Sequence, residues 1–194
     1  MKRVIIVHGW VGNPKENWFP WLKKELEGIG CEVLIPQLPE AETPKIDNWV
    51  PMLSKVAGEV DENTYFVGHG MGCQTIARYL ETLKEGKKVG GVVFVAGFFK
   101  RLTGLEIEDQ KVWKHWLNTP INFEKIKSHF LTGVAIFSDN DSYVPLDNQD
   151  DFRDKLGSKI TILSRRGHFS GGEDQCFELP EALNALEKIF ELRN

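Results

Sequence analysis

The amino-acid sequence predicts an α/β fold, a doubly wound and mostly parallel sheet with helices on both faces. Short runs of β-branched and aromatic residues alternate with longer segments in which apolar residues recur at helical spacing. Several predicted strand cores, such as VIIV, VVFV and VAIF, are apolar throughout, which is typical of parallel strands buried on both faces. Alternating strands and helices build right-handed βαβ units. The chain of 194 residues is therefore expected to form a single α/β domain over residues 1–194.

Each element is predicted from its own residue pattern, in chain order. Strands are expected over residues 3–9, 31–38, 64–68, 90–99, 133–138 and 159–164. Helices are expected over residues 20–30, 47–60, 71–83, 148–156 and 179–192. In the first helix Leu22, Leu26 and Ile29 share one face, and in the second Pro51 is expected in the first turn, where proline is tolerated. The mixed and charged segment 98–132 is expected to form a short cap-like segment.

Charge and composition exclude several classes of protein. The formal net charge is -4, and the sequence has no long basic run, so no nucleic-acid partner is expected. The apolar run that follows the N-terminus is too short for a signal peptide, and no segment approaches the roughly 18 apolar residues of a membrane span, so the chain is expected to be cytoplasmic. The three cysteines are odd in number and far apart, which indicates reduced thiols. His115 and His129 lack a ligand pattern around them, so no metal and no cofactor are expected.

The third predicted strand meets its helix at the sequence Gly-His-Gly-Met-Gly, residues 68–72. This is the layout of a nucleophile elbow, G-x-S-x-G, with Gly70 where the serine would stand. In such an elbow Gly68 and Gly72 allow strand and helix to pack closely, and the N–H of Met71 points at the developing oxyanion. The motif therefore indicates hydrolase geometry without the nucleophile side chain.

Phosphate-binding loops are the main alternative for this glycine-rich turn. A dinucleotide-binding fingerprint needs a third small residue, but Cys73 stands there, and the next strand ends in Val95-Ala96-Gly97 without the expected acidic residue. A Walker loop lacks its Lys-Ser/Thr pair. Nucleotide binding is therefore disfavoured.

Three other strand ends carry residues of interest, because ligands bind beyond the carboxyl ends of parallel strands. A glycine-rich turn with His8 follows the first strand, and we expect this histidine to be structural. Asp139 and Asp141 follow the fifth strand, and His168 follows the sixth. Elbow, then acid, then histidine is the chain order of α/β-hydrolase triads.

These segments resemble those of a known family. The matching pieces are IVHGW, NWFPWLKKEL, NTYFVGHGMGC, GGVVFVAGF, SDNDSYVP, RGHF and ELP, spread from Val4 to Pro180. Together they are similar to the small serine hydrolases related to retinoblastoma-binding protein nine, and most of all to their bacterial YdeN-like branch. The resemblance implies a minimal α/β-hydrolase fold and a Ser-Asp-His triad that acts on small-molecule carboxylic esters or amides.

The resemblance also implies roles for individual residues. Asp141 would be the acid, with Asp139 the weaker candidate, His168 the general base, the N–H groups of Trp10 and Met71 the oxyanion hole, and Gly70 the nucleophile position. Glycine has no side chain to attack a carbonyl, so no acyl-enzyme can form by the usual route. Cys73 is expected to face away from the oxyanion donors and cannot replace it. The chain is thus expected to be inactive or nearly so.

Two explanations of Gly70 compete. One is an engineered Ser→Gly change in an otherwise active enzyme, and the other is a natural pseudo-hydrolase that serves as a binding or interaction protein. The first is favoured because the acid, the base and the elbow glycines are all retained. A protein partner is left open.

Aromatic residues near the expected cap are candidates for the substrate pocket. Phe98 and Phe99 come directly after the run VVFVAG, and Trp113 and Trp116 lie within the cap-like segment. They are expected to form an apolar wall for an acyl or leaving group, although the two tryptophans could instead be a helix-packing pair.

Overall fold

The computed structural model describes residues 1–192, in which six strands form one parallel sheet. The strands are β1 (Arg3–Val7), β2 (Glu32–Leu34), β3 (Thr64–His69), β4 (Gly91–Val95), β5 (Gly133–Ser138) and β6 (Lys159–Leu163). Their order across the sheet is β2-β1-β3-β4-β5-β6, and every neighbouring pair is parallel. The predicted fold class is confirmed.

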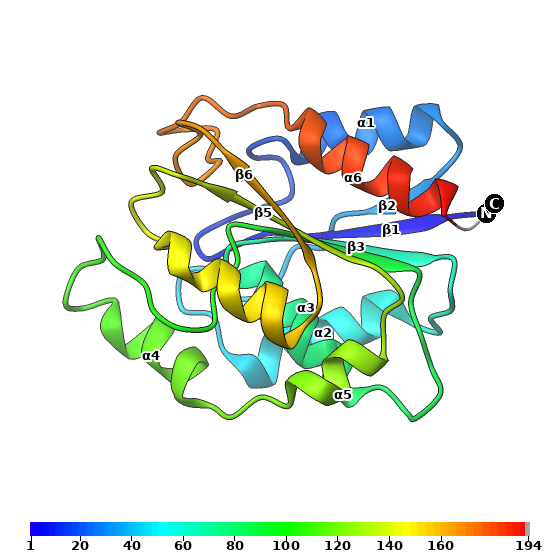
Figure 1. The fold of residues 1–194 in the computed structure, drawn as a ribbon. Helices are drawn as coiled ribbons and strands as arrows, with labels where there is room; N and C mark the ends of the chain where they lie inside the picture. The colour runs from blue at the N-terminus through cyan, green and yellow to red at the C-terminus, as the bar shows by residue number, and fades with distance from the viewer. Residues whose placement is uncertain (193–194) are drawn as a thin grey trace.

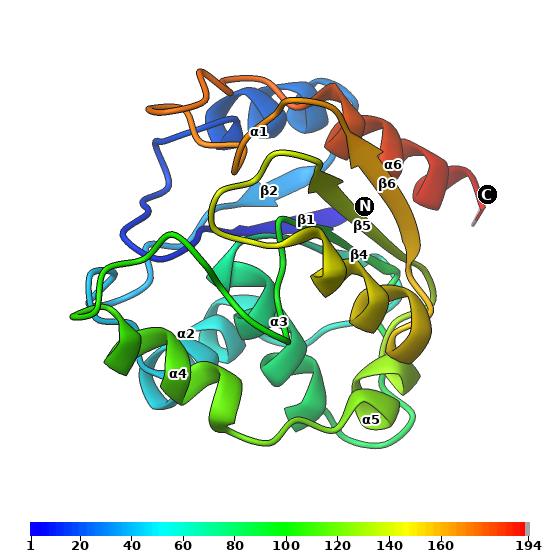
Figure 2. The ribbon, with the colours of Figure 1, turned by 60° about the vertical axis from the view of Figure 1, so that its left-hand side comes forward.

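Helices cover both faces of this sheet (Figures 1 and 2). They are α1 (Phe19–Gly28), α2 (Ile46–Ala57), α3 (Met71–Thr82), α4 (Gln110–Asn118), α5 (Phe123–Ser128) and α6 (Pro180–Glu191). In Figure 1, α1 and α6 lie above the sheet, and the other helices lie below it. Because successive strand residues point to opposite faces, Val4 and Ile6 pack toward α1 and α6, while Ile5 and Val7 pack toward α2 and α3.

Two details of the helices differ from the sequence prediction. Helix α1 ends at Gly28, so Ile29 lies beyond its last turn and is 53% exposed instead of sharing the buried face of Leu22 and Leu26. Helix α2 begins at Ile46, which places Pro51 in its second turn and not in its first. In both cases the helix boundary decided the outcome, and boundaries depend on packing that periodicity does not describe.

The expected helix over 148–156 is present as two short helical turns, a 3-10 turn over Leu146–Asn148 and a π turn over Asp151–Lys155. Phe152 in the second turn packs into the core on the α3 side. The segment 98–132 contains α4 and α5, preceded by an irregular stretch up to residue 109. Within residues 1–192, the structure has no helix that is both long and apolar enough to cross a membrane.

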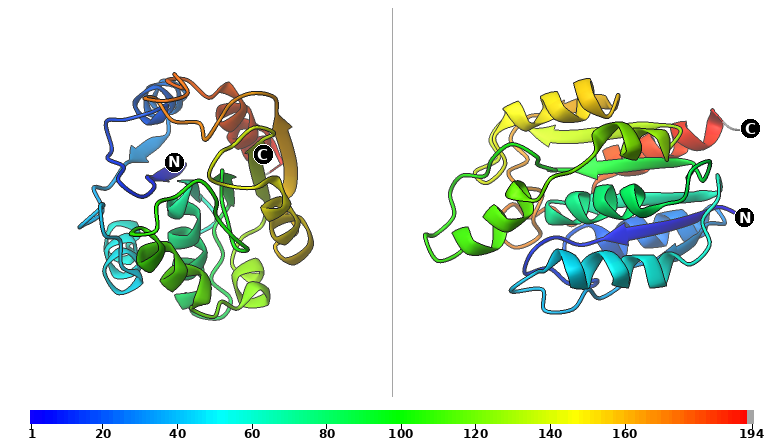
Figure 3. Two further views of the ribbon diagram at one scale, coloured as in Figure 1. Left: turned by 90° about the vertical axis from the view of Figure 1, so that its left-hand side faces the viewer. Right: turned by 90° about the horizontal axis from the view of Figure 1, so that it is seen from below.

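All six strands run in the same direction, so their carboxyl ends lie together at one edge of the sheet. Figure 3, left, looks onto this edge. The segments that follow β1, β3, β5 and β6 meet there, although they are far apart in the sequence. Any site built from strand ends must therefore form at this edge.

Candidate active site

A strained turn joins β3 to α3 at this edge. Gly70 is the one residue between them, with φ 53° and ψ −117°, a conformation that side chains rarely adopt. A Cβ atom added at Gly72 would lie 2.2 Å from the carbonyl oxygen of Val7, and one added at Gly68 would lie 2.8 Å from the amide nitrogen of Cys73. Both flanking glycines are thus required by close backbone packing, as the elbow prediction expects.

The side chains of Asp141 and His168 are in direct contact. The His168 Nδ1 atom lies 2.9 Å from Asp141 Oδ2, and the Asp141 carboxylate is almost fully buried. The second carboxylate oxygen accepts the backbone N–H groups of Tyr143 at 2.8 Å and Val144 at 2.9 Å, which fixes its orientation. With Nδ1 engaged, Nε2 of His168 faces Gly70, and a Cβ atom at residue 70 would lie 3.3 Å from it.

Asp139, the weaker candidate for the acid, binds a backbone N–H group of the loop after β6 instead of His168. Its Oδ1 atom accepts the backbone N–H of Arg165 at 2.8 Å, and this hydrogen bond lowers the pKa of its carboxyl group. Asn140 accepts the N–H of Gly167 at 2.9 Å. Residues 139 to 141 therefore tie the loop after β5 to the loop after β6, and only the last of them holds the imidazole.

Two backbone N–H groups are available near Gly70. Within residues 1–192, neither the N–H of Trp10 nor that of Met71 donates to another protein group. Trp10 belongs to the turn after β1, which is held by a hydrogen bond from Gly12 N to Gly9 O and by one from Val11 N to Ala41 O. Met71 is the first residue of α3, where N–H groups have no partner within the helix. Free donors of this kind are what an oxyanion hole requires.

The neighbouring His8 and Cys73 are structural. His8 donates from Nδ1 to Gly9 O at 2.8 Å and accepts the N–H of Leu38 on Nε2 at 3.0 Å, and burial lowers its pKa. Cys73 is fully buried, its Sγ atom lies 3.4 Å from Val95 O, and burial raises the pKa of its thiol. A thiol that resists ionisation and points away from the cavity is no substitute nucleophile.

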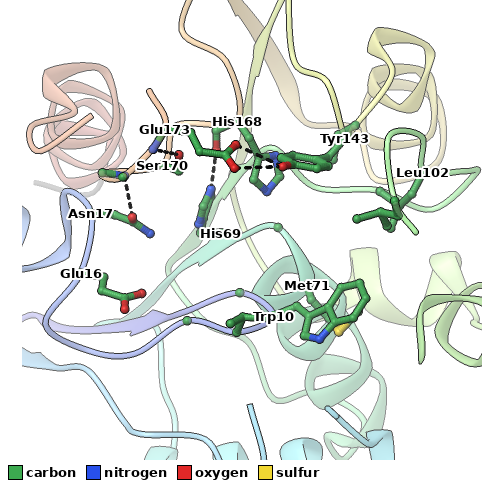
Figure 4. A pocket seen from close by; sticks show the side chains of 18 of the residues that line it. Trp10, Glu16, Asn17, His69, Met71, Leu102, Tyr143, His168, Ser170 and Glu173 are labelled. Carbon is green, nitrogen blue, oxygen red and sulfur yellow. Dashed lines mark hydrogen bonds between the residues drawn. The ribbon is translucent and has the colours of Figure 1, made fainter. Parts of the chain in front are cut away.

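Gly70 is part of the lining of a cavity of about 820 Å³. Figure 4 shows side chains that line this cavity. One part of its wall is apolar and includes Trp10, Met71, Phe98, Leu102, Leu105 and Val144. Other lining residues are polar and include Lys15, Glu16, Asn17, Ser170 and Glu173. The start of the cap-like segment therefore contributes to the wall, as do the loops after β1, β5 and β6.

Of the four aromatic residues predicted to line the pocket, Phe98 does so and the other three do not. The ring of Phe99 turns into the core, where it contacts Phe123 and Phe152 at centroid distances of 5.0 and 4.8 Å. Trp116 is fully buried and donates its indole N–H to Pro44 O at 3.0 Å. Trp113 packs against the same core.

The correction has a simple physical reason. Helix α4 turns its apolar face toward α2 and α3, as the edge-on contact between the rings of Trp116 and Trp49 shows. The tryptophans are therefore the helix-packing pair that remained as the alternative to an apolar wall.

Two residues around His168 were not singled out from the sequence. His69 lies 2.7 Å from the carbonyl oxygen of His168 through its Nε2 atom, and Asp174 accepts the backbone N–H of His168 at 2.9 Å. In the sequence, His69 occupies a variable position of the elbow motif, where any residue is allowed. Its partner is 99 residues further along the chain, so no local pattern could reveal the contact.

Comparison with known proteins identifies the family of this chain. The family described as "Serine hydrolase" matches residues 4–188. YdeN of Bacillus subtilis (strain 168) is 32% identical over 190 residues, which cover 97% of this chain and 96% of that protein. The serine hydrolase RBBP9 of Rattus norvegicus is 27% identical over 174 residues, covering 88% of this chain and 89% of that one.

Solved structures show the same relationship. The crystal structure of the ydeN gene product of B. subtilis superposes with a TM-score of 0.90 at 29% identity, over 98% of this chain and 100% of that one. Est1E of Butyrivibrio proteoclasticus, solved with ferulic acid, has a TM-score of 0.73 at 15% identity, over 99% and 88% of the two chains, and shares the fold. From its sequence and its fold, the chain belongs to the serine hydrolase family, on an α/β-hydrolase fold.

Proposed function

We propose that this chain carries a serine hydrolase site for carboxylic esters or amides in which the nucleophile position is held by Gly70. Asp141 and His168 are its acid and general base. The observation that carries the proposal is the line of three groups: the Asp141 carboxylate lies 2.9 Å from Nδ1 of His168, and Nε2 lies 3.3 Å from where a Cβ atom of residue 70 would stand.

A serine at this position would complete the chemistry. Its Oγ atom would extend from Cβ toward Nε2, within reach of a proton transfer to His168. Asp141 would hold the imidazole in the required tautomer and stabilise the imidazolium that forms. The N–H groups of Trp10 and Met71 would then donate to the carbonyl oxygen as it gains negative charge. With glycine there, no acyl-enzyme forms, and the chain is inactive or nearly so.

The origin of Gly70 has two candidate explanations. We infer an engineered Ser→Gly change, because the elbow glycines and the Asp141–His168 contact are those that a working nucleophile needs. In the alternative, a natural pseudo-hydrolase, the cavity of about 820 Å³ would bind a small ester or amide without turning it over. The gene in the source genome decides between them: a serine codon at position 70 supports the first, and a glycine codon supports the second.

The direct test is the Gly70→Ser variant. It is expected to hydrolyse short p-nitrophenyl esters and to react covalently with a fluorophosphonate probe, after a shift of His168 by a few tenths of an ångström to admit the side chain. Gly70→Ala supplies the matched control, because it adds the same Cβ atom without a hydroxyl group. Gly70→Ser/His168→Ala removes the base. A Gly70→Ser protein that is folded but neither labelled nor active would refute the proposal.

A further inference from the structure

The loop that carries His168 has an unusual backbone. Gly167 has a φ of 54° and Phe169 a φ of 58°, so His168 lies between two residues in the left-handed region. Phe169 is not a glycine, and such a conformation persists only where the surroundings hold it. The position of the imidazole therefore depends on contacts to the backbone of this loop as well as on Asp141.

His69 contacts this backbone from below, as Figure 4 shows. Its Nε2 atom lies 2.7 Å from the carbonyl oxygen of His168, which can only accept, so Nε2 carries the proton. The ring is buried, with edge-on contacts to Trp18 and Phe19. Burial, followed by the charge of His168, lowers the pKa of His69 to about 3, so the ring stays neutral and keeps this one N–H donor.

Asp174 contacts the other side of the same residue. Its Oδ2 atom accepts the backbone N–H groups of His168 and Ser170, and also the Ser170 hydroxyl, each at 2.9 Å. The N–H and the C=O of His168 are thus each held by a side chain, one from the elbow and one from the loop itself. The Asp174 side chain does not line the cavity, whereas the His69 ring forms part of its floor and lies 4.8 Å, centroid to centroid, from the His168 ring.

We propose that His69 and Asp174 are positioning residues that clamp the backbone of His168 so that its imidazole bridges Asp141 and residue 70. This inference rests on the proposed function, because it assigns the clamp to the general base. A displacement of a catalytic group by about 1 Å can reduce a rate by about 10²-fold, so a rigid clamp has a direct effect on turnover.

The first test uses the chain as it is, with glycine at position 70. The Nδ1 proton of His168, bonded to a carboxylate, gives a downfield and slowly exchanging signal in ¹⁵N-edited NMR, assigned by its loss in His168→Ala. His69→Phe keeps an aromatic ring but removes the donor, and is expected to broaden or lose this signal. His69→Gln places an amide N–H where Nε2 was, and is expected to retain it.

The chain offers a matched control in His129. This histidine is also buried, and its Nδ1 atom lies 2.7 Å from the carbonyl oxygen of Lys87, away from the cavity. His129→Phe therefore removes an equivalent hydrogen bond and should leave the His168 signal unchanged. Should His69→Phe fail to fold, Asp174→Ala tests the clamp from its other side, with the same loss expected. An unchanged signal in a folded His69→Phe or Asp174→Ala protein would overturn the proposal.

The second test measures turnover in the Gly70→Ser background. There His69→Phe and Asp174→Ala are expected to lower kcat by about 10- to 100-fold with KM changed less than about threefold, and His69→Gln to restore most of the loss. Equal losses in His129→Phe would reduce the effect to general destabilisation and contradict the clamp. If Gly70→Ser itself is inert, the proposed function fails, while the NMR signal still decides the clamp.

Discussion

Replacement of Gly72 by alanine tests the packing that builds the elbow. Gly72 lies in the first turn of α3, where alanine would ordinarily stabilise a helix by about 1 kcal/mol relative to glycine. Here the added Cβ atom would lie 2.2 Å from the carbonyl oxygen of Val7 and 2.7 Å from that of His8. Both are backbone atoms, so relief requires α3 to move away from β1 by about 1 Å, a typical case of overpacking.

The expected magnitude follows from these two terms. Overpacking costs about 1–3 kcal/mol in ordinary cases, and a contact this short against backbone belongs at the upper end or beyond it. After the gain in helix propensity, Gly72→Ala is expected to lower the free energy of unfolding by at least about 2 kcal/mol. The shift of α3 would also displace the N–H of Met71.

Gly28 provides the matched control, because it is the last residue of α1 and a Cβ atom there would meet nothing within 4 Å. Gly28→Ala is expected to stabilise the protein by up to about 1 kcal/mol. Urea unfolding followed by tryptophan fluorescence measures both changes. The reasoning from close packing would be refuted if the free energy of unfolding of Gly72→Ala lay within about 0.5 kcal/mol of the parent value. It would also be refuted if both substitutions changed the free energy of unfolding in the same direction.

Two further predictions concern the pH dependence of stability and the pocket wall. Folding lowers the pKa of His69 from 6.5 to about 3, so between these pH values the unfolded chain binds a proton that the folded chain does not. The contribution of His69 to the free energy of unfolding is therefore complete above pH 6.5. It decreases as the pH falls toward 3, by up to about 1.4 kcal/mol per pH unit. His69→Gln should flatten this slope between about pH 6 and pH 4 in urea unfolding, and an unchanged slope would contradict the assignment of a buried neutral ring. In the Gly70→Ser background, Phe98→Leu should raise KM for esters with apolar acyl groups, because Phe98 lines the cavity, whereas Phe99→Leu should lower stability and leave KM unchanged. Equal effects on KM would mean that the cavity wall is wrongly described.

Local patterns in the sequence were sufficient for the fold class and for much of the candidate site. Apolar strand cores separated by helical periodicity predict a parallel sheet, and a parallel sheet brings its strand ends to one edge. That rule placed Gly70, the pair Asp139 and Asp141, and His168 at one edge, and the family resemblance selected Asp141. In the structure Asp141 contacts His168, whose Nε2 atom faces Gly70. The sequence pattern also separated Cys73 from the site, because a residue three positions into a helix turns away from the helix start.

Tertiary structure decided which way individual side chains turn. Phe98 and Phe99 are adjacent in the irregular stretch after β4, yet one lines the cavity and the other packs in the core, because this stretch lies between the two. Trp116 belongs to the core because α4 turns that face toward α2, a choice that the periodicity of α4 does not contain.

The hydrogen bonds around the general base also depend on the complete fold. His69 donates to a carbonyl group 99 residues away. The N–H groups of Trp10 and Met71 lack an acceptor in the folded chain, and this follows only from the positions of all the surrounding groups. Periodicity in the sequence predicts which face of a helix or strand is buried. It does not predict which distant atoms contact that face, because those contacts depend on how all the elements pack together.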